Sequence, residues 1–201
     1  MKSVLISIQP KWCELIANGK KTVEVRKTKP KLETPFKVYI YCTANKQGTH
    51  DLLEIHGTDG KIRKANGKVI GEFVCERIDR IGKRGIPNNF DYCYLSLNEW
   101  GNDDIEIEIT DIKKSCISKE ELNLYGEKTN CLYAWHISDL VLYDKPKELN
   151  RFQKPCIRDC DCGGCENAYY TRDYGFEGCA LEEGLTRPPQ SWCYVEELGG
   201  G

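Results

Sequence analysis

The sequence predicts an α+β fold: a small, partly closed β-barrel with short helices at its ends, followed by a cysteine-rich extension. Residues 68–81 and 131–144 each have the composition of one long strand, longer than a flat sheet uses without curling. The helical patterns between the strands are short. After residue 150, glycines and cysteines replace aliphatic residues. We therefore expect residues 1–150 to form the barrel and residues 151–201 to be an appended element.

The individual strands and helices follow from local patterns along residues 1–150. Residues 10–19 predict a helix that begins with Pro10 and ends at Gly19. Residues 118–126 predict a second helix, opened by a capping box of Ser118 and Glu121. Residues 44–67 predict a loop with a short hairpin, and residues 145–152 predict a helical turn. Strands are expected at residues 3–8, 21–26, 36–43, 68–81, 104–110 and 131–144.

The charge of the chain is nearly balanced but unevenly distributed. The formal net charge is −2, which excludes a global attraction to nucleic acid or to a membrane. Residues 11–37 carry eight basic and three acidic residues, whereas residues 99–127 carry nine acidic and three basic ones. These are either two solvated faces of opposite sign, or the basic segment is prepared for a phosphate-bearing partner.

The cellular compartment is inferred from targeting signals, apolar runs and cysteine content. Neither a signal peptide nor an apolar run of membrane-spanning length is visible, so no membrane partner is expected. Twelve cysteines without a secretion signal indicate reduced thiols in a cytoplasmic compartment.

The stretch around Glu24 and Arg26 is the strongest candidate site. Successive side chains of a strand point to opposite faces, so Thr22, Glu24 and Arg26 share one face, and the valines at 23 and 25 share the other. The polar pair is either a surface salt bridge, which contributes ~0–1 kcal/mol, or part of a ligand site. In a site, Arg26 would hold a phosphate or stack on a base, and Glu24 would accept a hydrogen bond or orient Arg26.

The segment "ISIQPKWCELIANGKKTVEVRK" resembles the signature of the ASCH family, small β-barrels related to the PUA RNA-binding fold. The family pattern G-x-K-x-x-E-x-R is matched by Gly19, Lys21, Glu24 and Arg26, and the resemblance covers about residues 1–150. It implies a cleft that holds RNA, a nucleotide or a modified nucleoside. The expected ligand-binding residues are Trp12, Lys20, Lys21, Thr22, Glu24 and Arg26.

The resemblance also implies an enzymatic alternative. One branch of the family hydrolyses N4-acetylcytidine with a lysine, a threonine and a glutamate. Lys21 matches that lysine, but the threonine falls on Glu24 here, and Thr22 lies two positions away. We therefore favour binding. The alternative is a hydrolase acting on a modified nucleoside, or a ribonuclease, with Lys21 and Glu24 as catalytic residues.

The extension carries a candidate metal site. The pair Cys162 and Cys165 forms a C-x-x-C knuckle, and four thiolates would complete a tetrahedral structural zinc site. The alternatives are a reduced disordered tail, a redox pair or disulfides. A zinc-stabilised module that binds another protein is a third possible function. The ligands would be four of the five residues Cys156, Cys160, Cys162, Cys165 and Cys179.

The chain then ends on one more strand pattern. Residues 191–195 predict a strand that docks back on the barrel, either closing an edge or bringing Gln190 or Trp192 to the site. Of these two roles, edge closure is the one we favour.

Overall fold

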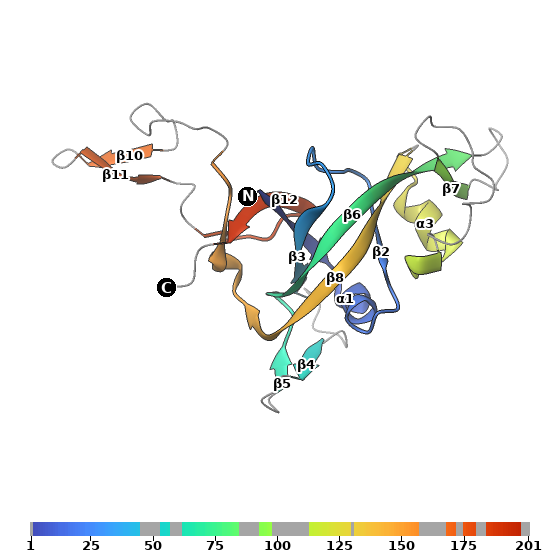
Figure 1. The fold of residues 1–201 in the computed structure, drawn as a ribbon, viewed down its shortest axis with the longest axis horizontal. Helices are drawn as coiled ribbons and strands as arrows, with labels where there is room; N and C mark the ends of the chain where they lie inside the picture. Colours follow the sequence, from blue (N-terminus) through green and yellow to red (C-terminus); the bar gives the residue numbers. More distant parts are fainter. Residues whose placement is uncertain are drawn as a thin grey trace. The chain divides into compact units, whose positions relative to one another are not determined.

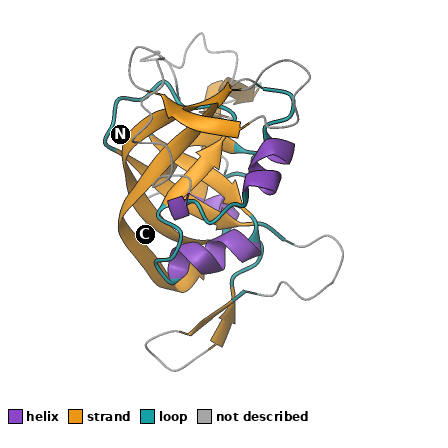
Figure 2. Cartoon of the chain, turned by 90° about the vertical axis from the view of Figure 1, so that its right-hand side faces the viewer, coloured by secondary structure: helices purple, strands orange, loops and turns teal. Residues whose placement is uncertain are grey.

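The computed structural model describes residues 2–44, 53–56, 62–84, 93–97, 113–129, 131–156, 168–171, 175–179 and 184–197. Strands account for most of this structure, and the helices are few and short (Figure 2). The helices are α1 (Pro10–Ala17), α3 (Lys119–Tyr125) and the 3₁₀ turn η1 (Leu149–Arg151). The strands are β1 (Ser3–Ile8), β2 (Val23–Arg26), β3 (Phe36–Cys42), β4 (Glu54–His56), β5 (Ile62–Lys64), β6 (Lys68–Arg84), β7 (Cys93–Leu97), β8 (Cys131–Lys147), β9 (Phe152–Gln153), β10 (Ala168–Thr171), β11 (Gly175–Cys179) and β12 (Trp192–Glu197).

The chain divides into two compact units. The first comprises Met1–Pro10, Val38–Gly71 and Leu142–Gly201, and the second comprises Lys11–Lys37 and Glu72–Val141. Each unit has a hydrophobic core of its own. The division of the sequence at residue 150 stays a prediction.

In the first unit, β1 lies between β3 and β12 in the hydrogen-bonded order; its two neighbours are labelled in Figure 1. It runs parallel to β3, with Val4 opposite Val38, and antiparallel to β12, with Ser3 opposite Val195. β12 in turn pairs with β9. All six residues of β1 are buried, which explains its nearly continuous apolar sequence. The core of this unit is formed by Leu5, Tyr39, Tyr41, Val69, Phe152 and Val195.

The second unit is built around β8. β2 pairs antiparallel with β8, with Val25 opposite Ala134, and β7 pairs antiparallel with β6. α3 begins at the capping box that the sequence predicts: the Glu121 N–H donates to the Ser118 side chain, and the Ser118 N–H donates to the Glu121 carboxylate. The core of this unit consists of Val23, Val25, Ile81, Leu122, Leu132 and Ala134, with Ile117 and Tyr125 packed against it.

The structure confirms the sheet-rich fold and corrects the expected closure. Among the described strands, the hydrogen-bonded order is β2-β8-β6-β3-β1-β12-β9, an open path whose end strands do not pair with each other. The prediction of a partly closed barrel is therefore wrong for these strands. The physical reason is length, because β2 has four residues and β9 only two, so neither offers the long ladder that closure needs.

Most local predictions hold, with shifted boundaries. The hairpin expected within residues 44–67 is formed by β4 and β5. β8 continues to Lys147, and the helical turn expected at residues 145–152 begins only at Leu149. Pro146 explains this shift, since a proline holds the preceding residue in an extended conformation. The strand expected at residues 104–110 lies outside the described residues.

Candidate functional site

The end of α1 fixes the backbone of the candidate site. Gly19 has a φ of +73°, the left-handed conformation that glycine adopts without strain. Its N–H donates to the Ile16 carbonyl at 3.0 Å, and the Lys21 N–H donates to the Leu15 carbonyl at 2.9 Å. The helix therefore stops at the point where Lys21 is held against its last turn.

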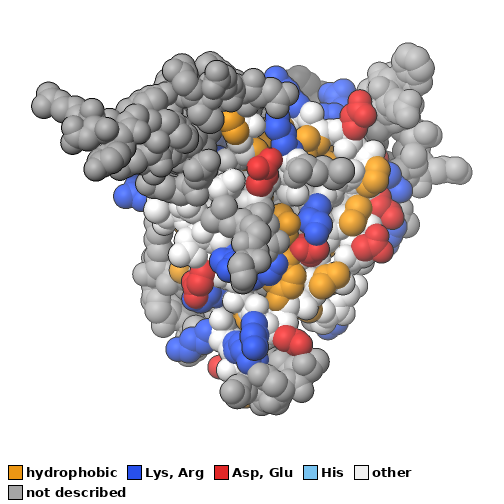
Figure 3. Space-filling model, turned by 60° about the vertical axis from the view of Figure 1, so that its left-hand side comes forward, with side chains coloured by type: hydrophobic (Ala, Val, Ile, Leu, Met, Phe, Trp, Pro, Cys, Tyr) orange, Lys and Arg blue, Asp and Glu red, His pale blue; other side chains and the backbone are white. Residues whose placement is uncertain are grey.

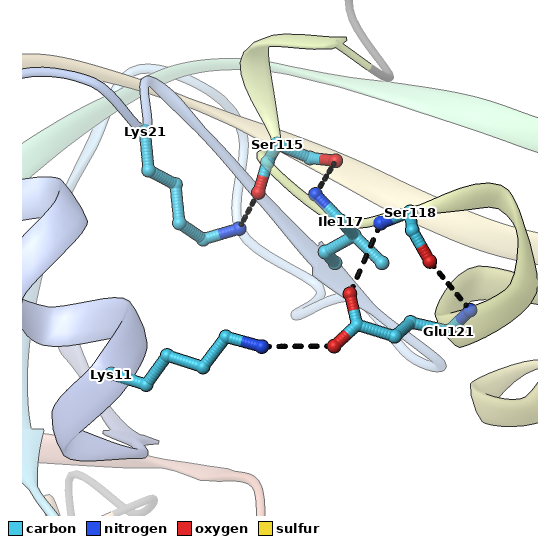
Figure 4. A network of polar contacts seen from close by, with 6 residues as sticks. All are labelled: Lys11, Lys21, Ser115, Ile117, Ser118 and Glu121. Atoms are coloured by element: carbon cyan, nitrogen blue, oxygen red, sulfur yellow. Dashed lines mark hydrogen bonds and ion pairs between the residues drawn. The ribbon is translucent and has the colours of Figure 1, made fainter. Parts of the chain in front are cut away.

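Lys21, Glu24 and Arg26 form one buried ion cluster. The Lys21 Nζ lies 3.2 Å from Glu24 Oε2, and the Arg26 Nε lies 3.0 Å from Glu24 Oε1. The exposed fractions of the three residues are 1%, 6% and 8%. The Lys21 ammonium also donates to the carbonyl of Ser115 at 2.6 Å, which ties the cluster to the segment that precedes α3 (Figure 4).

The burial of this cluster excludes a surface salt bridge, whereas the alternative of a ligand site stays a prediction. A surface salt bridge would be exposed, and a strand face turned to solvent would leave Thr22, Glu24 and Arg26 equally open. Instead, Thr22 is exposed while Glu24 and Arg26 are buried. The cause is the pairing of β2 with β8, which sets Glu24 opposite Trp135 and Arg26 opposite Tyr133.

The other predicted ligand-binding residues are placed unevenly around the cluster. Trp12 is half-buried on α1, and the Lys21 Nζ lies 5.0 Å from the centroid of its ring. The Lys11 Nζ lies over the same ring at 4.3 Å and pairs with Glu121 of α3 at 2.9 Å (Figure 4). Lys20 is exposed, and its carbonyl accepts a hydrogen bond from Cys116 Sγ.

Two tyrosines that no sequence pattern indicated interact with or pair with Arg26. Tyr125, on α3, accepts a hydrogen bond from the Arg26 guanidinium, and burial raises the pKa of its hydroxyl. Tyr133, on β8, is the cross-strand neighbour of Arg26. The capping box at Ser118 predicts the helix that carries Tyr125, but no local pattern indicates which strand this helix would face.

A second polar group in the same unit involves His136. Its Nε2 lies 2.7 Å from Asp79 Oδ2, and Arg77 Nε lies 3.0 Å from the same oxygen. The hydrogen bond with His136 is the main reason that the pKa of Asp79 is lowered. Cys75 lies nearby in sequence, and burial raises the pKa of its thiol to about 12. This thiol is protonated at neutral pH, so the group is not an activated cysteine nucleophile.

The zinc prediction falls mainly on residues that the structure does not describe. Cys160, Cys162 and Cys165 lie outside the described residues, Cys156 is exposed, and Cys179 ends β11. Within the described part of the chain, no three potential ligand side chains gather as a metal site. Zinc therefore stays a prediction, to be tested by elemental analysis of protein purified under reducing conditions.

Chemically, the cluster is suited to holding an anion in place. Two cations share one carboxylate, so these three side chains carry one excess positive charge. Burying such charge is costly unless it is compensated. Both Glu24 oxygens face a cation, so Glu24 could act as a base only if one of these contacts broke.

No described helix is long and apolar enough to cross a bilayer.

Comparisons with known proteins show what the sequence and the fold of this chain are similar to. A protein-family model described as the ASCH domain matches residues 6–147. The crystal structure of ASCH from Zymomonas mobilis is 18% identical with a TM-score of 0.50, covering 96% of this chain and 87% of that one. A mutant protein of that ASCH is also 18% identical, with a TM-score of 0.49 and coverage of 98% and 91%. No curated protein sequence matches this chain. At this identity, the structural likeness concerns the fold alone.

Proposed function

Because this chain belongs to the ASCH domain family, we propose that it binds single-stranded RNA or a nucleotide at the cluster of Lys21, Glu24 and Arg26. The observation that carries this proposal is the buried cluster itself, in which two cations share one carboxylate. A phosphate would compensate the excess positive charge, and the planar guanidinium of Arg26 matches phosphate oxygens or a base edge.

The three residues have different roles in this proposal. The side chains of Arg26 and Glu24 keep 10% and 8% of their surface exposed, so a ligand touches their outer edges. Lys21 is only 1% exposed and is held by Ser115, so it acts as a positioning residue that fixes Glu24. Glu24 in turn holds Arg26 and accepts a hydrogen bond from a base amino group.

The surface charge supports a local rather than a broad site. Figure 3 shows lysine and arginine side chains mixed with acidic ones on one face of the described residues. A chain with a formal net charge of −2 attracts phosphate through such local groups rather than through its overall field.

Replacing Arg26 tests the proposal. Arg26→Ala should weaken binding of a labelled single-stranded RNA by about 1.5–3 kcal/mol, the scale of a hydrogen bond to a charged group. Arg26→Lys keeps the charge and loses the planar fork, so it should recover only part of the affinity. Arg187, exposed in the other compact unit, provides the matched control Arg187→Ala. Equal affinity of Arg26→Ala and Arg187→Ala would reject the proposal.

The enzymatic alternative is tested with the same protein. Incubation with single-stranded RNA and with acetylated cytidine should give no product over many equivalents of substrate. The protein forms product over multiple turnovers only if it is an enzyme. Loss of that product in Lys21→Ala or Glu24→Gln would therefore show that the function is catalysis and not binding alone. The Gln variant is informative because it is nearly isosteric but takes up no proton.

A further inference from the structure

We infer that the tyrosines beside Arg26 extend the site into a stacking surface for at least two consecutive bases, so that the ligand is a single-stranded polynucleotide rather than a free nucleoside. This inference rests on the proposed function. Its observation is a repeated pairing: the Lys27 Nζ lies 4.8 Å from the ring centroid of Tyr125, and the Lys29 Nζ lies 5.8 Å from that of Tyr133. Both lysines are exposed and both tyrosines are half-buried.

Arg26 joins the two lysine–tyrosine pairs into one surface. Arg26 donates a hydrogen bond to Tyr125, and Tyr133 on β8 is the cross-strand partner of Arg26. The two rings come from different elements, α3 and β8, and both belong to neighbours of the same arginine. Burial raises the pKa of the Tyr133 hydroxyl, and the positive charge of the exposed Arg80 acts in the opposite direction.

The chemistry of this surface fits nucleic acid better than an acidic protein. A single strand presents a phosphate and an aromatic ring with every nucleotide, and proteins bind it with cationic grooves and aromatic platforms. An acidic peptide supplies the negative charges but no aromatic ring at each of them. Two lysine–tyrosine contacts next to one arginine therefore match a polynucleotide, which presents a phosphate and a base in each nucleotide.

The lysines over the rings do not block stacking, because stacking is the stronger contact. A base stacked on an aromatic side chain strengthens binding by about 5- to 150-fold. An exposed cation–π contact contributes only about 2- to 5-fold. A base therefore displaces the lysine from its ring, and the freed ammonium then lies beside a phosphate of the same strand.

Ring substitutions test stacking without removing the packing. Tyr133→Leu should weaken binding of an eight-nucleotide uridine RNA at least about fivefold, while Tyr133→Phe, which keeps the ring, stays within about twofold of wild type. Tyr125→Leu should behave like Tyr133→Leu. The chain supplies a matched control in its other unit, where the Lys147 Nζ lies 4.2 Å from the Tyr143 ring centroid. Tyr143→Leu should leave the affinity unchanged.

Charge and length provide two independent readouts. For single strands, each phosphate contact contributes about −0.7 to the slope of log K against log salt. The double change Lys27→Gln/Lys29→Gln should therefore make the slope shallower by about 1.4, whereas Lys147→Gln should not change it. Affinity should rise from one to several nucleotides, and an oligomer of the same length without bases should bind at least about fivefold more weakly.

The outcomes separate this inference from the proposed function. If Arg26→Ala weakens binding but mononucleotide and oligomer bind equally and the Leu variants are unchanged, the stacking surface is overturned and the Arg26 site stands. If Arg26→Ala has no effect, the proposed function fails first. If polyglutamate competes as well as RNA, the surface is a general polyanion or acidic-protein site and the inference is overturned. Circular dichroism confirms that each variant is folded.

Discussion

Replacing the carboxylate of Glu24 should show how much the buried ion cluster contributes to the free energy of unfolding. Glu24→Gln keeps the size of the side chain but leaves the two cations, Lys21 and Arg26, without the negative charge that lies 3.2 and 3.0 Å from them. Removing one partner of a buried pair costs about 3–5 kcal/mol, because uncompensated charge remains buried. For a chain of this size, that lowers the melting temperature by about 6–20 °C.

The assay is urea unfolding followed by circular dichroism, with an exposed pair as control. Glu121 pairs with Lys11 at 2.9 Å, and their side chains are 46% and 55% exposed. Glu121→Gln should therefore cost only ~0–1 kcal/mol. The double variant Lys21→Met/Glu24→Gln should lose less stability than the sum of its two single changes, because it also removes the Lys21 charge that Glu24→Gln leaves uncompensated. A Glu24→Gln variant as stable as Glu121→Gln would refute this reasoning about the cluster.

Three further predictions concern the fold. Ser118→Ala removes the hydroxyl that accepts the Glu121 N–H at the start of α3 and should cost about 1 kcal/mol in urea unfolding; no loss would show that the cap is dispensable. Gly184→Ala would press a Cβ against the Asn150 carbonyl oxygen, so it should cost at least about 1–3 kcal/mol, and a neutral effect would mean this approach is not tight. The lowered pKa of Asp79 stabilises the fold above its ordinary pKa of about 3.9, and this contribution is lost as pH falls through the folded value. Asp79→Asn should therefore be less stable than wild type at pH 7 but similar to it near pH 2, and an equal deficit at both pH values would contradict this.

Local sequence signals predicted the elements better than their partners. The β-branched run at residues 3–8 and the capping box at Ser118 gave β1 and α3 at nearly their observed bounds, because their signals lie within the elements. The motif also placed Lys21, Glu24 and Arg26 correctly in one group. Their burial was not predictable, because it depends on pairing with β8, more than 100 residues away in sequence.

The contacts that define the site are the ones that sequence spacing cannot show. Lys21 is held by a backbone carbonyl 94 residues later, at Ser115. Tyr125 reaches Arg26 from a helix whose own sequence indicates its bounds but not the strand that it faces. The open order of the described sheet was missed for a related reason, since closure depends on the end strands and not on the long central ones.

A structure of the protein with a short uridine RNA bound would show whether Arg26 is the point of contact for a single-stranded polynucleotide. We predict an RNA phosphate or base edge within hydrogen-bond distance of the Arg26 guanidinium, with bases stacked on Tyr125 and Tyr133. RNA bound at residues of the other compact unit, with Arg26 contacting only Glu24 and Tyr125, would contradict the proposal that Arg26 contacts the polynucleotide.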